Sequence, residues 1–200
     1  MKKILHIIST PQGESSYSLQ LGNAIVKKLQ DTYPDNTVKE VNLAKRQLPQ
    51  LQAAHIHAFF TLEENRTPEN IDNIRHSDEA IADVRDADIL VIGTPVHNHG
   101  ITSTLKTWID HIVRAGITFK YDENGAEGLV KGKKVYIAVA SGGIYSEGPY
   151  QAYDFVEPYL KAILGLIGLT DISVFRAEGT SIPGLKDSAL EKGINSIVLN

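Results

Sequence analysis

Short, almost wholly apolar runs alternate with longer amphipathic segments along nearly the whole chain, and this alternation constrains the fold more than any other feature. The runs are rich in β-branched residues, which predicts strands. We expect five, at Lys3–Ser9, Thr37–Leu43, Ile89–Thr94, Val135–Ala140 and Asp171–Ala177. The first, third and fourth are nearly continuous in apolar character, as is typical of parallel strands that are covered on both faces.

The amphipathic segments predict helices that cover such a sheet. The second of them has a clear start, because Thr67 can cap the helix and Pro68 suits its first position. In the third, Trp108, Ile109 and Ile112 form an apolar face that either packs in the core or contacts a second subunit. The expected helices are Ser18–Thr32, Thr67–Arg85, Ile101–Arg114, Tyr150–Leu166 and Lys186–Leu199.

Strand–helix alternation predicts right-handed crossovers and a doubly wound α/β sheet. Five strands favour the flavodoxin-like order 2-1-3-4-5 over the six-stranded dinucleotide-binding order. The 200 residues suit one domain, 1–200, and we find no repeat or linker. Ligands bind such sheets beyond the carboxyl ends of the strands, where the strand order reverses. Here that place lies between the first and third strands.

A long connection, Leu48–Arg66, follows the second predicted strand and contains His55, His57, Phe59 and Phe60. Connections of this length in a compact domain are more often functional than structureless. We therefore expect this segment to be a lid or a partner surface.

Composition narrows the classes of partner and chemistry. The chain has no cysteine, which excludes disulfides, cysteine nucleophiles and thiolate metal sites. A net charge of −4 argues against a nucleic-acid surface. The first apolar run is short and interrupted by His6, unlike a signal peptide, and no run approaches the ~18 residues of a membrane span. We expect a cytoplasmic protein without a membrane or nucleic-acid partner.

The first predicted strand leads into a hydroxyl-rich stretch, Ser9–Ser18, just before a helix. Helix N-termini bind anions through free amides, so Thr10, Ser16 and Ser18 could help to hold a phosphate monoester. Neither G-x-G-x-x-G nor the P-loop pattern occurs here. The alternative is that Ser15 to Ser18 simply cap the helix.

Two further strands end in loops that could hold a flat ring. Thr94–Gly100 could flank the ring, with Asn98 pairing to its polar edge, and Gly142-Gly143 allows a close backbone approach. A phosphate at the first loop and a ring at these two suit flavin mononucleotide (FMN), although a solvated loop and an ordinary turn remain alternatives. His97 and His99 have a spacing seen in metal ligands, but no cysteine or carboxylate completes a set, so we expect no metal.

Other catalytic classes fit less well. The chain has no G-x-S-x-G elbow and no cysteine nucleophile, which disfavours a hydrolase. A phospho-acceptor domain would need acidic residues after the first strand, where this chain has Ser9-Thr10-Pro11.

Several stretches occur in the same order as in the FMN-dependent NADH-azoreductase family, which the chain resembles over nearly its whole length. That family comprises flavodoxin-like NAD(P)H:quinone oxidoreductases. The stretches are Thr10–Glu14 with Ser16–Ser18, Leu105-Lys106, Ala115–Tyr121, Gly128–Lys134, Gly142–Tyr145 with Gly148-Pro149, and Ala177–Gly179.

The resemblance implies a homodimer with one FMN per subunit, each bound near the subunit interface. Phe119 and Tyr121 would lie on the substrate side. The implied cofactor contacts fall into three groups: Thr10, Ser16, Tyr17 and Ser18 for phosphate and ribityl, Val96, His97, Asn98 and His99 along the ring, and Ala140, Ser141, Gly142 and Gly143 at its polar edge. Relatives commonly carry a thioether and aromatics in the second group, and often arginine or another polar residue at Ser141.

The implied activity is two-electron reduction of quinones and cleavage of aromatic azo compounds with NADH or NADPH, by ping-pong hydride transfer through FMN. The flavin carries this chemistry, so no side-chain nucleophile is required. Gly142 and Gly143 amides could stabilise charge on the reduced ring, and His97 or His99 are candidate proton donors. The alternative is an FMN electron carrier without nicotinamide turnover, a role that usually goes with stronger acidity.

Overall fold

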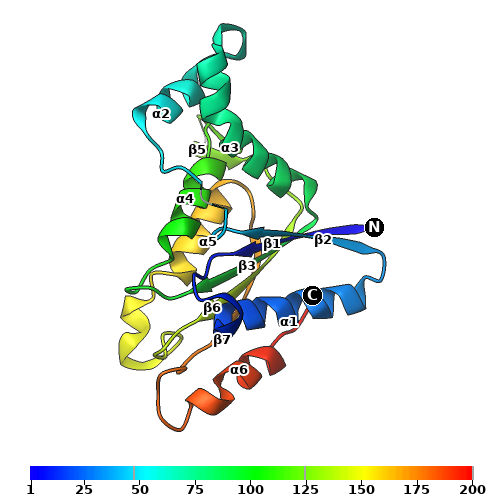
Figure 1. Ribbon diagram of the computed structural model, residues 1–200, viewed down its shortest axis with the longest axis vertical. Coiled ribbons are helices and arrows are strands. Elements are labelled where there is room, and N and C mark those ends of the chain that lie inside the picture. The colour runs from blue at the N-terminus through cyan, green and yellow to red at the C-terminus, as the bar shows by residue number, and fades with distance from the viewer. Residues whose placement is uncertain (47, 124, 200) are drawn as a thin grey trace.

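Five parallel strands form one sheet in the order β2-β1-β3-β6-β7 (Figure 1). The computed structural model describes residues 1–46, 48–123 and 125–199. The predicted order 2-1-3-4-5 is confirmed once β6 and β7 are counted as the fourth and fifth strands of this sheet. The strands are β1 (Lys2–Ile8), β2 (Asn36–Asn42), β3 (Ile89–Pro95), β6 (Lys134–Ala140) and β7 (Asp171–Ala177).

The three strands with nearly continuous apolar sequence are the three central strands. In β1, β3 and β6 almost every residue is buried, whereas β2 and β7 lie at the edges and expose part of their side chains. A central parallel strand is covered by helices on both faces, so it has no position at which a polar side chain reaches water. The apolar runs therefore identified the middle of the sheet as well as its strands.

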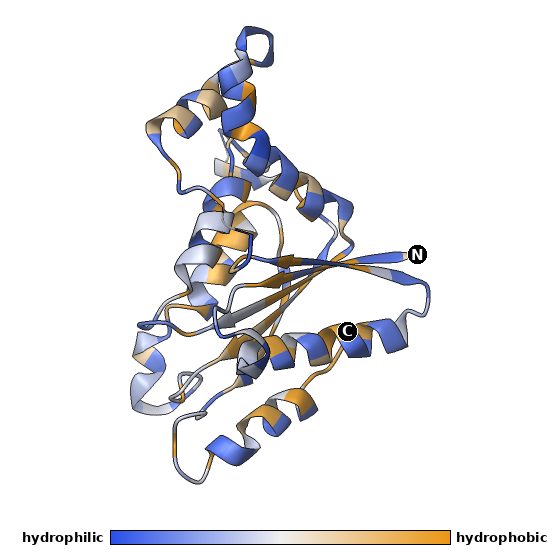
Figure 2. Cartoon of the chain, viewed as in Figure 1, coloured by the Kyte–Doolittle hydropathy of each residue, from blue (hydrophilic) through white to orange (hydrophobic). Residues whose placement is uncertain are grey.

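Helices cover the two faces in separate layers (Figure 1). One layer contains α1 (Tyr17–Thr32) and α6 (Lys186–Asn195), which pack on residues such as Ile4 and Val91. The other contains α3 (Pro68–Asp86), α4 (Ser103–Ile112) and α5 (Glu157–Leu166). Figure 2 shows the hydrophobic sides of the helices turned toward the sheet.

The two possible roles of the α4 apolar face are now distinguished. Trp108, Ile109 and Ile112 are at most 2% exposed and belong to the core beneath α3 and α5. They are core residues, and burial within one chain leaves them no surface for a second subunit.

Local capping explains where two helices begin. Thr67 accepts a hydrogen bond from the Asn70 amide at 3.2 Å, so the predicted start of α3 is confirmed. The helix predicted from Tyr150 is wrong at its start, because Asp154 accepts hydrogen bonds from the Val156 and Glu157 amides and opens α5 there. Residues Gly148–Tyr153 form a separate 3-10 helix, η3. The predicted helices Ile101–Arg114 and Lys186–Leu199 are also shorter than expected.

The structure contains elements that the sequence analysis did not predict. Within Leu48–Arg66 lies α2 (Ala53–Phe60), which packs on α3 with His55 buried, and the 3-10 helix η2 (Glu63–Asn65) follows it. A separate antiparallel hairpin joins β4 (Phe119–Asp122) to β5 (Gly125–Gly128). A further 3-10 helix, η1 (Gly13–Ser15), precedes α1. All of these elements are too short for their hydrophobic periodicity to stand out.

The hairpin lies at the amino ends of the sheet strands. The Arg85 guanidinium at the end of α3 donates to the Ile117 carbonyl at 2.6 Å, just before β4. At the other side, Gly128 packs directly on the backbone of Gly168, which precedes β7. In the described ranges, no helix is long and apolar enough to cross a membrane.

The ionisable side chain of His6 is buried in the centre of β1. Its side chain is 0% exposed, and neither ring nitrogen has a hydrogen-bond partner among the described residues. The ring packs against Gly22 of α1, and a Glu40 oxygen lies 3.8 Å from Nδ1. Burial disfavours the charged imidazolium and lowers the pKa of His6 from 6.5 to about 4.

We expect this buried imidazole to make the fold sensitive to acid. Between pH 6.5 and 4 the unfolded chain binds a proton at His6 that the folded chain does not, so the free energy of unfolding falls as pH falls. The loss from this group is about 2 kcal/mol on going from pH 7 to pH 5. Urea unfolding at both pH values should show a smaller loss for His6→Leu than for wild type. Equal losses in the two proteins would contradict the assignment.

Candidate functional site

The loops that follow β1, β3 and β6 meet at the carboxyl edge of the sheet, as predicted. Ser9 Oγ donates to the Gly93 carbonyl at 2.9 Å, which ties the end of β1 to β3. The Val96 amide donates to the Ala140 carbonyl at 2.8 Å, which ties the end of β3 to β6. Three chain segments that are far apart in sequence therefore form one continuous surface.

The β1 loop places buried hydroxyls at the start of α1. Ser16 Oγ lies 3.0 Å from Ser18 Oγ, and Thr10, Ser16 and Ser18 are all at most 2% exposed. Ser16 occupies the N-cap position, but its side chain makes no capping hydrogen bond, so the capping alternative is not observed. Thr10 Oγ1 accepts from the Gln12 amide at 3.2 Å and stabilises its own turn.

The first turn of α1 adds backbone donors to these hydroxyls. The amides of Tyr17, Ser18 and Leu19 donate to no group in the described part of the chain, as expected for a helix start. The helix can lie this close to β3 because residue 93 is glycine; a Cβ there would lie 3.1 Å from the Ser18 carbonyl oxygen. Free amides, the positive end of the helix dipole and two adjacent hydroxyls together suit an anion.

The β3 loop is a tight turn with an unusual backbone. His97 and Gly100 exchange two backbone hydrogen bonds of 2.9 Å, which leaves Asn98 and His99 at the tip. Both have positive φ, 48° and 66°, the left-handed conformation of a two-residue hairpin turn. Asparagine tolerates this conformation better than most residues. The turn presents three exposed side chains, those of His97, Asn98 and His99.

The β6 loop has its carbonyls bonded and two of its amides free. The carbonyls of Ser141, Gly142 and Gly143 accept from the amides of Thr180, Ser181 and Gly179, each at 3.1 Å. The Gly142 and Gly143 amides, in contrast, donate to no described residue. The segment after β7 thus fixes the loop through its carbonyls and leaves two adjacent donors for a ligand.

Aromatic side chains join the β3 and β6 loops. The hydroxyl of Tyr145 lies 3.3 Å from His99 Nδ1, and their rings meet edge-on at 5.8 Å between centroids. The His99 ring also contacts Tyr153 of η3 at 5.4 Å. The sequence analysis assigned no role to Tyr145 or Tyr153. For Tyr145, its position directly beyond Gly142-Gly143 was a signal in the sequence that could have identified it.

On the other side of the β3 turn, His97 and Asn98 line a cavity of about 580 Å³ together with Lys106, Phe155 and Tyr159. Phe155, which is 57% exposed, contributes an apolar surface to its lining. Within the described ranges, no three histidine, cysteine or acidic side chains are grouped so that they could hold a metal ion.

Phe119 and Tyr121 are the two predicted site residues that do not join the others. They lie on the β4–β5 hairpin at the amino ends of the strands, opposite the three loops. Phe119 is buried in the core, whereas Tyr121 is 71% exposed and packs edge-on against it at 5.4 Å. Within one chain, these side chains do not face the loops.

Comparison with known proteins finds relatives over nearly the whole chain. A family model described as a flavodoxin-like fold matches residues 2–198. The chain is 45% identical over 199 residues to the FMN-dependent NADH:quinone oxidoreductase of Herminiimonas arsenicoxydans, covering 98% of this chain and 97% of that protein. It is 43% identical over 196 residues to the protein of the same name from Nostoc sp., covering 97% and 93%.

Solved structures show the same likeness. The crystal structure of an azoreductase from Bacillus anthracis str. Sterne superposes with a TM-score of 0.90 at 30% identity, covering 98% of this chain and 96% of that one. A FMN-dependent NADH-azoreductase from Bacillus anthracis str. Ames Ancestor, solved in complex with FMN, gives 0.86 at 28% identity, covering 98% and 97%.

The positive φ at His99 leads to a stability prediction. His99→Asn and His99→Val both remove the imidazole from Tyr145, but only asparagine readily adopts the left-handed conformation. We expect His99→Val to be less stable than His99→Asn by about 1 kcal/mol in urea unfolding. Equal stability of the two variants would show that the turn relaxes to negative φ without cost.

Proposed function

The chain belongs to the flavodoxin-like family of FMN-dependent NADH:quinone oxidoreductases, and on that premise we propose that it is an enzyme that binds FMN and uses NADH or NADPH to reduce quinones by two electrons. The observation that carries this proposal is a set of backbone amides at one edge of the sheet that have no acceptor among the described residues. Three of them begin α1 beside the buried hydroxyls of Ser16 and Ser18, and two lie in the β6 loop.

The donor set fits the two ends of FMN. Thr10, Ser16, Tyr17 and Ser18 would hold its phosphate and ribityl chain, because a helix start with free amides stabilises a phosphate without a cation. Val96, His97, Asn98 and His99 would lie along the flavin ring. The polar edge of the ring would meet the β6 loop, at Ala140, Ser141, Gly142 and Gly143.

When bound, FMN supplies the hydride and electron transfer that no side chain here provides. The Gly142 and Gly143 amides would stabilise negative charge near the ring, since the β6 loop fixes their orientation and they have no acceptor among the described residues. His97 and His99 are exposed imidazoles that can donate a proton to the acceptor. We propose that nicotinamide and acceptor bind in turn at the same place, a ping-pong order, and that aromatic azo compounds are reduced there in two such cycles.

A second subunit completes the proposal. Tyr121 is exposed at the far end of the sheet from the loops of its own chain, so it would reach a substrate only at the site of another copy, and the buried Phe119 would support its ring from beneath. We therefore propose a homodimer with one FMN per subunit. The substrate-side role of Phe119 and Tyr121 depends on it. We also propose that the enzyme acts in the cytoplasm, where it has access to NADH and NADPH.

A spectroscopic titration tests the central proposal. Purified protein given FMN should show a protein-bound flavin spectrum that bleaches with NADH in the absence of oxygen and recovers when a quinone is added. Flavin that stays oxidised with both NADH and NADPH would favour the electron carrier. If no flavin binds, the proposed function is wrong.

Matched serine variants localise the phosphate site in the same titration. Removing both hydroxyls in Ser16→Ala/Ser18→Ala should raise the Kd for FMN at least tenfold, since hydrogen bonds to a charged group are strong. Ser15→Ala is the control, because its exposed hydroxyl donates to the Gln12 carbonyl and not to the site. Equal weakening by the control and the double variant would refute the assignment.

The two histidines are tested by separating the half-reactions. Replacing both, as His97→Gln/His99→Gln, should slow oxidation of the reduced enzyme by quinone severalfold while leaving its reduction by NADH near the wild-type rate. The reason is that only the acceptor needs a proton from the protein. Stopped-flow absorbance measures each step, and equal loss in both would contradict a proton-donor role.

A further inference from the structure

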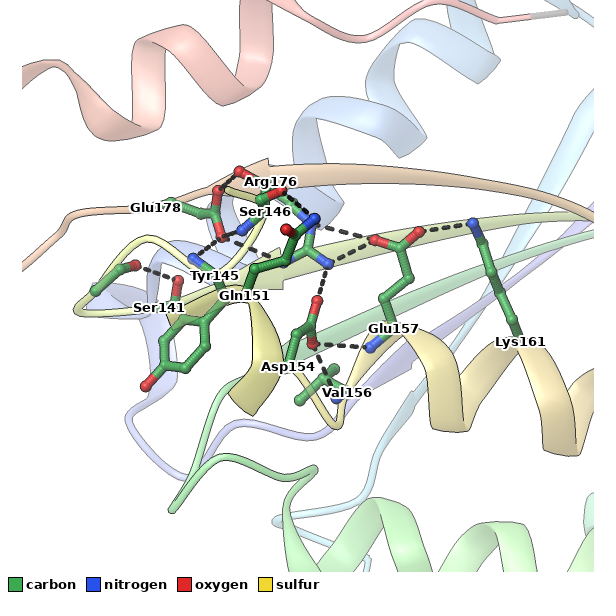
Figure 3. Close-up of polar contacts among 11 residues, drawn as sticks. Ser141, Tyr145, Ser146, Gln151, Asp154, Val156, Glu157, Lys161, Arg176 and Glu178 are labelled. Atoms are coloured by element: carbon green, nitrogen blue, oxygen red, sulfur yellow. Dashed lines mark hydrogen bonds and ion pairs between the residues drawn. The ribbon is translucent and has the colours of Figure 1, made fainter. Parts of the chain in front are cut away.

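A largely buried group of charges lies behind the β6 loop, between β7 and the start of α5 (Figure 3). Arg176 of β7 is only 13% exposed and pairs with three carboxylates. Its Nη2 lies 2.5 Å from Asp154 Oδ2 and 2.5 Å from Glu157 Oε2, and its Nη1 lies 3.2 Å from Glu178 Oε1. None of these residues belongs to the proposed flavin contacts.

Two of the carboxylates hold Arg176 from the α5 side. Asp154 also accepts from the first amides of α5, and Glu157 also pairs with Lys161 at 2.6 Å. Burial disfavours the guanidinium charge, but hydrogen bonds to Glu157 and Asp154 outweigh it and raise the pKa of Arg176 above its usual value. The Arg176 guanidinium is therefore charged and held in place by Asp154 and Glu157 through Nη2, and its Nη1 pairs with Glu178.

Glu178 uses its carboxylate mainly to hold the chain that follows the β6 loop. Its Oε1 accepts from the Tyr145 amide at 2.8 Å and from the Ser146 amide at 3.0 Å. Its Oε2 accepts from Ser146 Oγ at 2.5 Å. A carboxylate that is 12% exposed and accepts from two successive amides is a strong, directional anchor for a segment without helix or strand structure.

This anchor determines where Tyr145 lies. The Tyr145 backbone is bound to Glu178, and its hydroxyl reaches His99 Nδ1 at 3.3 Å on the β3 turn. The residues directly after Glu178 hold the carbonyls of Ser141 to Gly143. The exit of β7 therefore orients the whole β6 loop: backbone amides 179–181 bind its first part and the Glu178 carboxylate binds its second.

We propose that Glu178 is a positioning residue for the flavin site, held in place by Arg176, and that it acts by fixing Tyr145 against His99 and the Gly142-Gly143 amides toward the ligand. The inference rests on the proposed function, since the loop it orders is the one assigned to the polar edge of the ring. Glu178 itself touches none of the residues assigned to the phosphate.

Amide hydrogen exchange on the flavin-free protein tests the anchor directly. Glu178→Ala should speed exchange of the Tyr145 and Ser146 amides at least tenfold, because both lose their acceptor. Glu178→Gln keeps a carbonyl oxygen and should fall between Ala and wild type. Asp171→Asn is the matched control, since that carboxylate pairs with Lys134 at 3.1 Å at the other end of the same strand, β7. Exchange equal to wild type in both Glu178 variants would overturn the proposal.

Flavin titration then tests whether the anchor matters to the site. Both Glu178 variants should bind FMN severalfold more weakly and alter the visible spectrum of the bound flavin, with a rise in KM for quinone larger than the fall in kcat. Faster exchange with unchanged Kd, spectrum and KM would reduce Glu178 to a structural role and overturn the proposal. If Glu178→Ala does not fold, Glu178→Gln carries the same measurements.

Flavin binding by the wild-type protein and the behaviour of the Glu178 variants test the proposed function and the role of Glu178 separately. A wild-type protein that binds no flavin refutes the proposed function, while the exchange of the Tyr145 and Ser146 amides still decides whether Glu178 anchors the loop. A wild-type protein that binds and reduces flavin, with Glu178 variants identical to it in every readout, refutes the positioning role alone.

Discussion

The site depends on the rigidity of three central strands. Since β1, β3 and β6 each have a hydrogen-bonded neighbour on both sides and helices on both faces, their carboxyl ends are held in one register. The loops that begin at the carboxyl ends of these strands are therefore held at fixed positions relative to one another. The cross-strand bonds from Ser9 to Gly93 and from Val96 to Ala140 extend that register by one residue into the loops. The packed core therefore determines where the backbone donors of the three loops lie. Short loops are sufficient, because they add little freedom to the positions of the strand ends.

Much of this arrangement is predictable from the sequence, because it depends on local composition. Continuous apolar runs identified the central strands, Thr67 marked the start of α3, and the hydroxyl-rich stretch around Ser16 marked the start of α1. The positions of the glycines predicted a close backbone approach in the β6 loop. Each of these signals reflects a physical requirement met within a few residues of the chain.

The remaining features depend on contacts between distant residues, which no local pattern encodes. The left-handed turn at Asn98 and His99 contains no glycine, and it is fixed by the paired backbone bonds of its neighbours. The eight-residue α2 is stabilised by packing on α3. Glu178 is an ordinary acid in the sequence, and its role follows only from the approach of Tyr145, 33 residues away. The prediction that Phe119 and Tyr121 lie beside the substrate concerns a second subunit and stays a prediction.

The β6 loop offers its ligand main-chain donors, and this has a consequence for how such a protein can change over time. A substitution at Gly142 or Gly143 removes the backbone N–H only if it introduces proline, although a Cβ at Gly142 would lie 2.8 Å from Ser181 Oγ and one of the two would have to move. The exposed side chains of the β3 turn, His97, Asn98 and His99, can in contrast be replaced without opening the core. On the proposed function, the surroundings of the ring could therefore change at these three positions while the main-chain donors of the β6 loop stay in place.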